Sequence, residues 1–177
     1  MWGRDPGRAL TEGERALATG IFGDAIALDQ VRLHRRKWWP LQPRNVVMAP
    51  DGAIWFHPLS ELWRDDFSVA PPYLQALLLH ELTHVYQAQK GGRFYLLLAR
   101  HPFCRYRYAL KPGCPFEHYG IEQQAEIVRH AFMQRIGQPV PDAPPLRQLE
   151  DLLPFCRSDA MGATNGHGQR PGSGRAR

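Results

Sequence analysis

The sequence lacks any long apolar run. None of its 177 residues belongs to an uninterrupted apolar stretch of about eighteen residues or more, the length that a transmembrane helix needs. Residues 1–17, MWGRDPGRALTEGERAL, are charged and lack the apolar centre of a secretory signal. We therefore expect no membrane span and synthesis in the cytoplasm, with any export following a leaderless route.

Cysteine is also scarce. The three cysteines, Cys104, Cys114 and Cys156, are too few for a disulfide framework, and their spacings match no cysteine-based zinc site. Free thiols are the expected state in a cytosolic protein. A bridge between Cys104 and Cys114 is the alternative if the protein works outside the cell.

Residues 1–156 also lack a large excess of basic residues, although the formal net charge of the whole chain is +5. Residues 157–177 hold four Arg and one Asp, which leaves only about +2 for the rest of the chain. This tail contains no aromatic residue and no Leu, Ile or Val, so we expect it to be disordered, with residues 1–156 forming a single domain. The segment HRRKWW, residues 34–39, has the composition of some nucleic-acid sites. An edge strand with packed Trp side chains is the more common structure, and we expect no nucleic-acid partner.

The first third of the chain predicts one helix and a small sheet. Thr11 and Glu14 have the spacing of a capping box, which predicts a helix of about ten residues. The segments QVRLHRR, NVVMAP and AIWFHP predict about three strands, with a hairpin at Asp51-Gly52. Helices and strands that follow one another in this way indicate an α+β fold.

Three more helices are predicted further along. Pro71 and Pro72 suit a helix start, and a stripe of Leu and Val predicts a helix over 73–90 that ends at Gly91-Gly92. A second apolar stripe predicts a helix that begins near Ile121 and ends at Gly137, and PPLRQLEDLLP predicts a last short one. Residues 92–119 read as a long loop in which RFYLLLAR has the composition of an additional short helix.

Residues 77–90, LLLHELTHVYQAQK, contain the pattern His-Glu-x-x-His. On a helix, His80 and His84 lie one turn apart on one face, so both imidazoles can reach one metal ion. Glu81 is rotated by about 100° from His80, which puts its carboxylate where a general base can take a proton from an activated water. Short patterns also arise by chance, but the amphipathic helix around this one favours a metal site.

A catalytic zinc site needs a third protein ligand. No His stands six residues beyond His84, so the extended His-rich form of the motif is absent. In the downstream segment GIEQQAE, Glu122 and Glu126 share one helix face, so one acid can bind the metal while the other orients a histidine ring. The remaining candidates beyond His84 are His101, Glu117, His118 and His130.

The pairing of His-Glu-x-x-His with a downstream Glu-x-x-x-acid helix resembles the gluzincin branch of zinc metallopeptidases. That resemblance implies a zincin-like fold, zinc bound by His80, His84 and Glu122, and Glu126 as the acid that orients a ligand. The usual acid at that last position is Asp. The segments LTEGERA, FGDAIALDQVRLH, AIWFHP and HELTHVYQ, within residues 10–136, also resemble the metallopeptidase-like domain of bacterial extracellular contractile injection systems and Vgr-related sequences.

The resemblance implies hydrolysis of a peptide or protein substrate, with Glu81 as the general base. A hydroxyl or imidazole group should stabilise the oxyanion. We favour Tyr119, which stands just before the Glu122 helix, over the other candidates Tyr106, Tyr108 and His118. Two further hypotheses are a non-catalytic zinc-binding component of a secretion or injection apparatus, and an effector delivered by such an apparatus.

Overall fold

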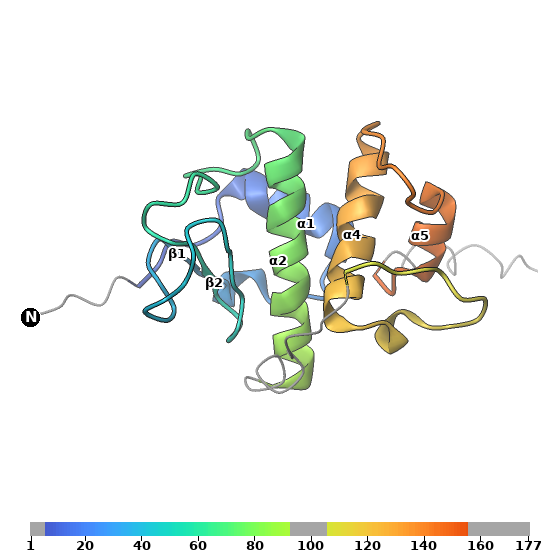
Figure 1. Cartoon of the computed structure of the whole chain (residues 1–177), viewed down its shortest axis with the longest axis horizontal. Helices are drawn as coiled ribbons and strands as arrows, with labels where there is room; N and C mark the ends of the chain where they lie inside the picture. Colours follow the sequence, from blue (N-terminus) through green and yellow to red (C-terminus); the bar gives the residue numbers. More distant parts are fainter. Residues whose placement is uncertain (1–5, 93–105, 156–177) are drawn as a thin grey trace, which may run out of the picture.

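The computed structural model describes residues 6–92 and 106–155, and in these ranges it contains helices and a small parallel sheet (Figure 1). In chain order the elements are helix α1 (Glu12–Phe22), 3-10 helix η1 (Leu28–Gln30), strands β1 (Leu33–His34) and β2 (Ile54–Trp55), helix α2 (Pro72–Gly91), 3-10 helix η2 (Phe116–His118), and helices α4 (Ile121–Arg135) and α5 (Leu146–Leu152). This mixed architecture agrees with the predicted α+β class.

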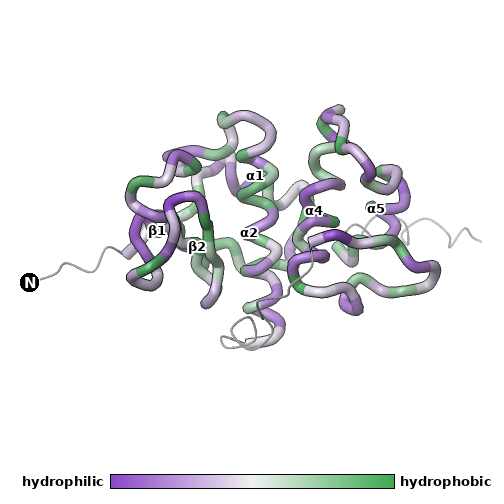
Figure 2. The backbone as a smooth tube through the Cα atoms, viewed as in Figure 1, coloured by the Kyte–Doolittle hydropathy of each residue, from purple (hydrophilic) through white to green (hydrophobic). Residues whose placement is uncertain are grey.

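Helix α2 lies at the centre of the molecule. The sheet and its loops lie on one side of α2, and α4 and α5 lie on the other (Figure 1). Apolar side chains on α2, including Leu74, Leu78, Leu82 and Val85, are fully buried. Hydrophobic and hydrophilic residues are interspersed along the helices (Figure 2), and every residue of α2 from Leu78 to Ala88 is buried. Within the described ranges, no helix is both long and apolar enough to cross a bilayer.

The predicted helices are confirmed with small shifts at their ends. Thr11 and Glu14 form the expected reciprocal capping box at the start of α1, and Gly23 follows its last residue. Helix α2 begins at Pro72 and ends at Gly91, and Gly92 has a φ of 87°, a conformation that favours glycine. The proposed short helix over 93–100 and the disordered tail over 157–177 lie outside the described residues.

The sheet is smaller than the sequence predicts. Strands β1 and β2 pair in parallel, with Leu33 opposite Ile54 and His34 opposite Trp55. The hairpin at Asp51-Gly52 is present as a single antiparallel bridge between Met48 and Trp55. Regular pairing is short because prolines interrupt the segment between the strands and remove backbone donors.

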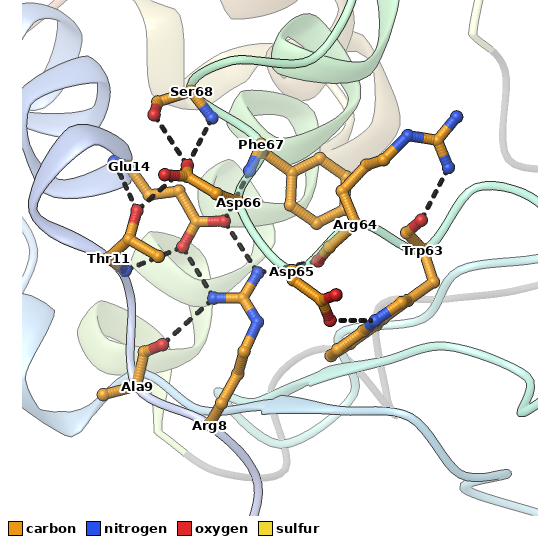
Figure 3. Close-up of polar contacts among 10 residues, drawn as sticks. All are labelled: Arg8, Ala9, Thr11, Glu14, Trp63, Arg64, Asp65, Asp66, Phe67 and Ser68. Atoms are coloured by element: carbon orange, nitrogen blue, oxygen red, sulfur yellow. Dashed lines mark hydrogen bonds and ion pairs between the residues drawn. The ribbon is translucent and has the colours of Figure 1, made fainter.

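A buried carboxylate joins the N-terminal segment to the loop before α2 (Figure 3). Glu14 is inaccessible to solvent, and the Arg8 guanidinium donates two hydrogen bonds of 2.7 Å to its two oxygens. The backbone N–H groups of Thr11 and Phe67 donate to the same carboxylate, at 2.9 and 2.8 Å. The Glu14 carboxylate thus accepts four hydrogen bonds, two of them from a cation, and these compensate its buried negative charge.

Helix α1 also approaches this loop closely at Gly13. A Cβ atom at that position would lie 2.2 Å from the Ser68 hydroxyl oxygen, so only glycine permits the contact. The Ser68 hydroxyl and backbone N–H in turn donate to the Asp66 carboxylate, and these hydrogen bonds lower the pKa of Asp66. The loop that leads into α2 is thus fixed against α1 by polar contacts.

We predict that Glu14→Ala lowers the free energy of unfolding by about 3 kcal/mol, because it leaves the Arg8 charge and two backbone donors without their acceptor. Chemical denaturation followed by circular dichroism measures this change. Glu12 precedes it by two residues in the same helix turn and is exposed, so Glu12→Ala is the matched control, with a loss of at most about 1 kcal/mol. Equal losses in the two variants would contradict the buried network.

Candidate metal centre

Helices α2 and α4 bring three possible metal ligands together. One ligand atom from each of His80, His84 and Glu122 lies within 4.8 Å of the others, and all three residues are buried. The Glu122 Oε2 atom is 3.4 Å from His80 Nε2 and 3.3 Å from His84 Nε2. Two imidazole nitrogens and a carboxylate oxygen therefore face a common point.

Helix geometry explains this convergence. His80 and His84 are four residues apart on α2, and their ring centroids are 5.1 Å apart. Glu122 lies in the first turn of α4, which packs against α2. The backbone N–H groups of that first turn favour a negative charge. Glu122 therefore lies where it could supply the third ligand that the sequence left open, and Glu126 lies one turn further along α4.

A chain of buried amides fixes the orientation of the His84 ring. The side-chain N–H₂ of Gln124 donates to the Tyr119 carbonyl at 2.7 Å, which turns its oxygen toward Gln87. The Gln87 N–H₂ donates to that oxygen at 2.9 Å and to the Ile121 carbonyl at 3.0 Å. The Gln87 oxygen therefore faces His84 Nδ1 at 2.9 Å and accepts its hydrogen. In the neutral ring, Nε2 then keeps the lone pair that a metal needs.

Charged groups hold the His80 ring in the same way. Glu126 Oε1 lies 3.0 Å from His80 Nδ1, so the carboxylate accepts the Nδ1 hydrogen and Nε2 faces Glu122. Arg129 donates to both oxygens of Glu126, at 2.7 to 3.0 Å, and His130 Nε2 lies 3.2 Å from Oε2. Glu126 therefore orients the His80 ring, and Arg129 and His130 position Glu126.

The electrostatics of the site favour a cation. Burial alone would lower the pKa of His80, but the carboxylates of Glu122, Glu126 and Glu81 outweigh this effect and raise the pKa to about 9. Burial would raise the pKa of Glu126, yet hydrogen bonds from His130, His80 and Arg129 lower it well below its usual range. Carboxylates that stabilise a positive imidazole also stabilise a metal ion at the same point.

Glu81 lies beside this group and lines a cavity of about 420 Å³ with His80, Tyr106, Glu126 and Arg129. The other residues that line it are Asn45, Val46, Val47, Leu62, Tyr73 and Leu77. The Glu81 side chain is buried, and its Oε2 makes no hydrogen bond to a described residue. Glu81 is thus an acid at the cavity wall whose buried Oε2 receives no hydrogen bond from a described residue.

The tyrosines that are candidate oxyanion donors differ in whether they line the cavity that contains Glu81. Tyr106 lines the cavity, and its ring stacks on His80 with centroids 6.5 Å apart. Tyr119 does not line this cavity, and its hydroxyl accepts a hydrogen bond from the Lys111 N–H at 2.9 Å. The Tyr108 hydroxyl lies 2.8 Å from His130 Nδ1. Tyr119 lines a larger cavity of about 770 Å³ between 110–119 and α5, which includes none of His80, His84 and Glu122.

The other residues that the sequence offered as a third metal ligand are not part of the group of His80, His84 and Glu122, or they lie outside the described residues. Glu117 and His118 lie on η2, are exposed, and are not part of the three-residue group. His130 contacts Glu126 rather than the ligand group, and His101 lies outside the described residues. Gln87 and Gln124 were missed in the sequence, where the only available signal was that they follow the predicted ligands His84 and Glu122 by three and two residues.

Comparison with known proteins identifies a bacterial relative. The chain is 38% identical to the effector domain of Pseudomonas aeruginosa VgrG2b, with a TM-score of 0.64 over 76% of this chain and 79% of that domain. It is also 41% identical over 140 residues to the type VI secretion system spike protein VgrG2b of the same species. That alignment covers 74% of this chain but spans only 13% of the length of the spike protein. No family model matches the sequence.

We predict that Gln87→Leu lowers zinc affinity by about tenfold, because the His84 ring loses the acceptor that fixes its orientation. Competition with a zinc-binding dye measures the dissociation constant. Gln89→Ala is the control on the same helix, since Gln89 is exposed and, among the described residues, its side chain bonds only to the backbone of Ala27. An unchanged affinity in Gln87→Leu would show that the amide chain does not act on the metal centre.

Proposed function

Since this chain belongs to the family of the VgrG2b effector domain, we propose that it is an effector associated with a bacterial secretion apparatus and that its activity is zinc-dependent hydrolysis of peptide bonds. The homology supports the association with a secretion apparatus, which the sequence suggested as an alternative. The proposed zinc-dependent hydrolysis rests on the side chains of the candidate metal centre. The observation that carries it is the buried group of His80, His84 and Glu122 with Glu81 beside it.

The donor set fits zinc. Two imidazoles and one carboxylate are a common ligand set of catalytic zinc sites, in which a further position stays open for water or substrate. Both ring Nδ1 atoms have an acceptor, and both Nε2 atoms face Glu122, as metal ligation requires. Bound zinc would supply a Lewis acid that polarises a carbonyl and lowers the pKa of water to about 7.

Glu81 has the position of the general base. Glu81 lines the cavity next to His80, and its buried Oε2 receives no hydrogen bond from a described residue. In hydrolysis it accepts a proton from the attacking water and can pass that proton to the leaving amine. Glu126 is already held by Arg129 and His130, so it serves to hold His80 rather than to transfer protons.

Tyr106 is the better-placed donor for the oxyanion. It lines the same cavity as Glu81, whereas Tyr119 does not line that cavity. We therefore propose Tyr106, in place of Tyr119, as the residue that stabilises the oxyanion. A non-catalytic zinc-binding component remains the hypothesis of a different class, and it requires the ligands but neither Glu81 nor a tyrosine.

We predict that the purified protein binds about one zinc ion per chain and that His80→Ala binds none, measured by inductively coupled plasma mass spectrometry. Glu81→Gln should keep the zinc but lower cleavage of a broad peptide library by about 10² to 10⁴-fold, because it removes the base. Glu117→Gln, the same change at an exposed acid, is the control and should retain activity. A chain without metal in zinc-replete medium would contradict the site, and a zinc-loaded wild type that cleaves no peptide would favour the non-catalytic component.

Tyr106 and Tyr119 can be separated by one matched pair of variants. We expect Tyr106→Phe to lower kcat by about 10² to 10³-fold with little change in KM, because the lost hydroxyl acts only on the transition state. Tyr119→Phe removes only a hydrogen bond to the loop backbone and should leave kcat within a fewfold of the wild type. The reverse result would return the role to Tyr119.

A further inference from the structure

The segment between the two strands presents aromatic and basic side chains that the proposed activity does not use. In residues 35–46, here called the Trp loop, every side chain except that of Gln42 is exposed. Trp38 and Trp39 expose 37% and 39% of their surface, and Leu41 exposes 75%. Large apolar side chains gathered at this exposure mark a contact surface more often than scattered single ones do.

Gln42 gives the Trp loop a defined shape. Its buried side chain accepts a hydrogen bond from the Trp38 N–H at 2.9 Å and donates to the carbonyls of Val46 and Trp55, at 2.9 and 3.1 Å. Its backbone N–H donates to the Trp39 carbonyl. The exposed side chains therefore project from a fixed backbone, so binding through them costs little ordering entropy.

The charge of the Trp loop has one sign. Arg35, Arg36, Lys37 and Arg44 lie in it, and no acidic residue occurs between Asp29 and Asp51. None of the four cations forms an ion pair with a described residue, whereas Arg35 and Arg36 lie over the rings of Trp63 and Trp55. Burial together with the charges of Lys37 and Arg44 lowers the pKa of the neighbouring His57, as a positive local potential would.

We propose that the Trp loop is a docking surface for an anionic lipid bilayer. Trp side chains prefer the interface between lipid and water, and neighbouring Arg and Lys are attracted to anionic headgroups. Leu41, the most exposed apolar side chain of the loop, can enter the acyl boundary but has no stacking role on a nucleic acid. The Arg35 side chain also donates a hydrogen bond to the Pro58 carbonyl at 3.3 Å, and the next residue, Leu59, is exposed.

Docking in this way would hold the candidate metal centre near the membrane. Val46 ends the Trp loop and lines the cavity that contains His80 and Glu81. A substrate at or near a bilayer surface would then lie close to the cavity. The docking surface itself depends on the loop alone, so it stands or falls independently of the peptidase activity.

Co-sedimentation of the full chain with sucrose-loaded vesicles tests the proposal. We expect binding to phosphatidylcholine vesicles that contain about 30 mol% phosphatidylglycerol, and little binding to phosphatidylcholine alone. The Trp38→Ala/Trp39→Ala variant should lower the partition coefficient by about tenfold. The Arg35→Gln/Arg36→Gln/Lys37→Gln variant should lower it by about fivefold per charge. Should that variant fail to fold by circular dichroism, Lys37→Gln/Arg44→Gln tests the charges without disturbing a ring contact.

Matched variants on the opposite side of the molecule control for nonspecific effects. Ile136→Ala removes an apolar side chain that is 41% exposed, and Lys111→Gln/Arg147→Gln removes two exposed cations; both should bind like the wild type. Vesicle binding that neither Trp loop variant weakens would overturn the proposal and assign the attraction to the four arginines of 157–177. Loop-dependent binding to a duplex or single-stranded oligonucleotide, without binding to vesicles, would overturn it in favour of a nucleic-acid surface.

Discussion

The packing of α2 against α4 is the constraint on which the candidate site depends. A helix can align two histidines by itself, but a third ligand has to come from another element at a fixed distance and rotation. The buried amide chain from His84 through Gln87 and Gln124 to the Tyr119 carbonyl crosses this helix interface. Because an unpaired amide in the interior is costly, the chain also favours one register of α4 over a neighbouring one.

The two histidines are held by chemically different partners, and their surroundings explain the difference. His84 is completely buried, and its partner is a neutral amide, which adds no further charge to the interior. His80 lines the cavity, and its partner is the charged Glu126, itself neutralised by Arg129. The Glu126 side chain suits this arrangement, because Arg129 and His130 fix the end of the side chain.

The N-terminal part of the chain supports the site from the other side of α2. The Glu14 cluster fixes the loop that leads into α2 (Figure 3), and the Trp loop reaches the edge of the cavity at Val46. In the Glu14 cluster and in the Trp loop alike, side-chain hydrogen bonds hold the backbone, since the strands are only two residues long. In a segment rich in proline, side-chain hydrogen bonds such as those of Gln42 and Asp51 hold the backbone where a regular ladder cannot.

The sequence by itself determined the helices and the two histidines of the motif, because those features depend on periodicity and on spacing within one helix. It also narrowed the third ligand to a few residues and indicated the relationship to Vgr proteins. It overestimated the strands, since alternation of apolar residues does not reveal whether a partner strand is in register. Only the tertiary structure placed Glu122 between the histidines, Glu126 behind His80, and Tyr106 rather than Tyr119 at the cavity. Those relations join residues distant along the chain, and their geometry is decided by how two helices and a loop pack rather than by any local pattern.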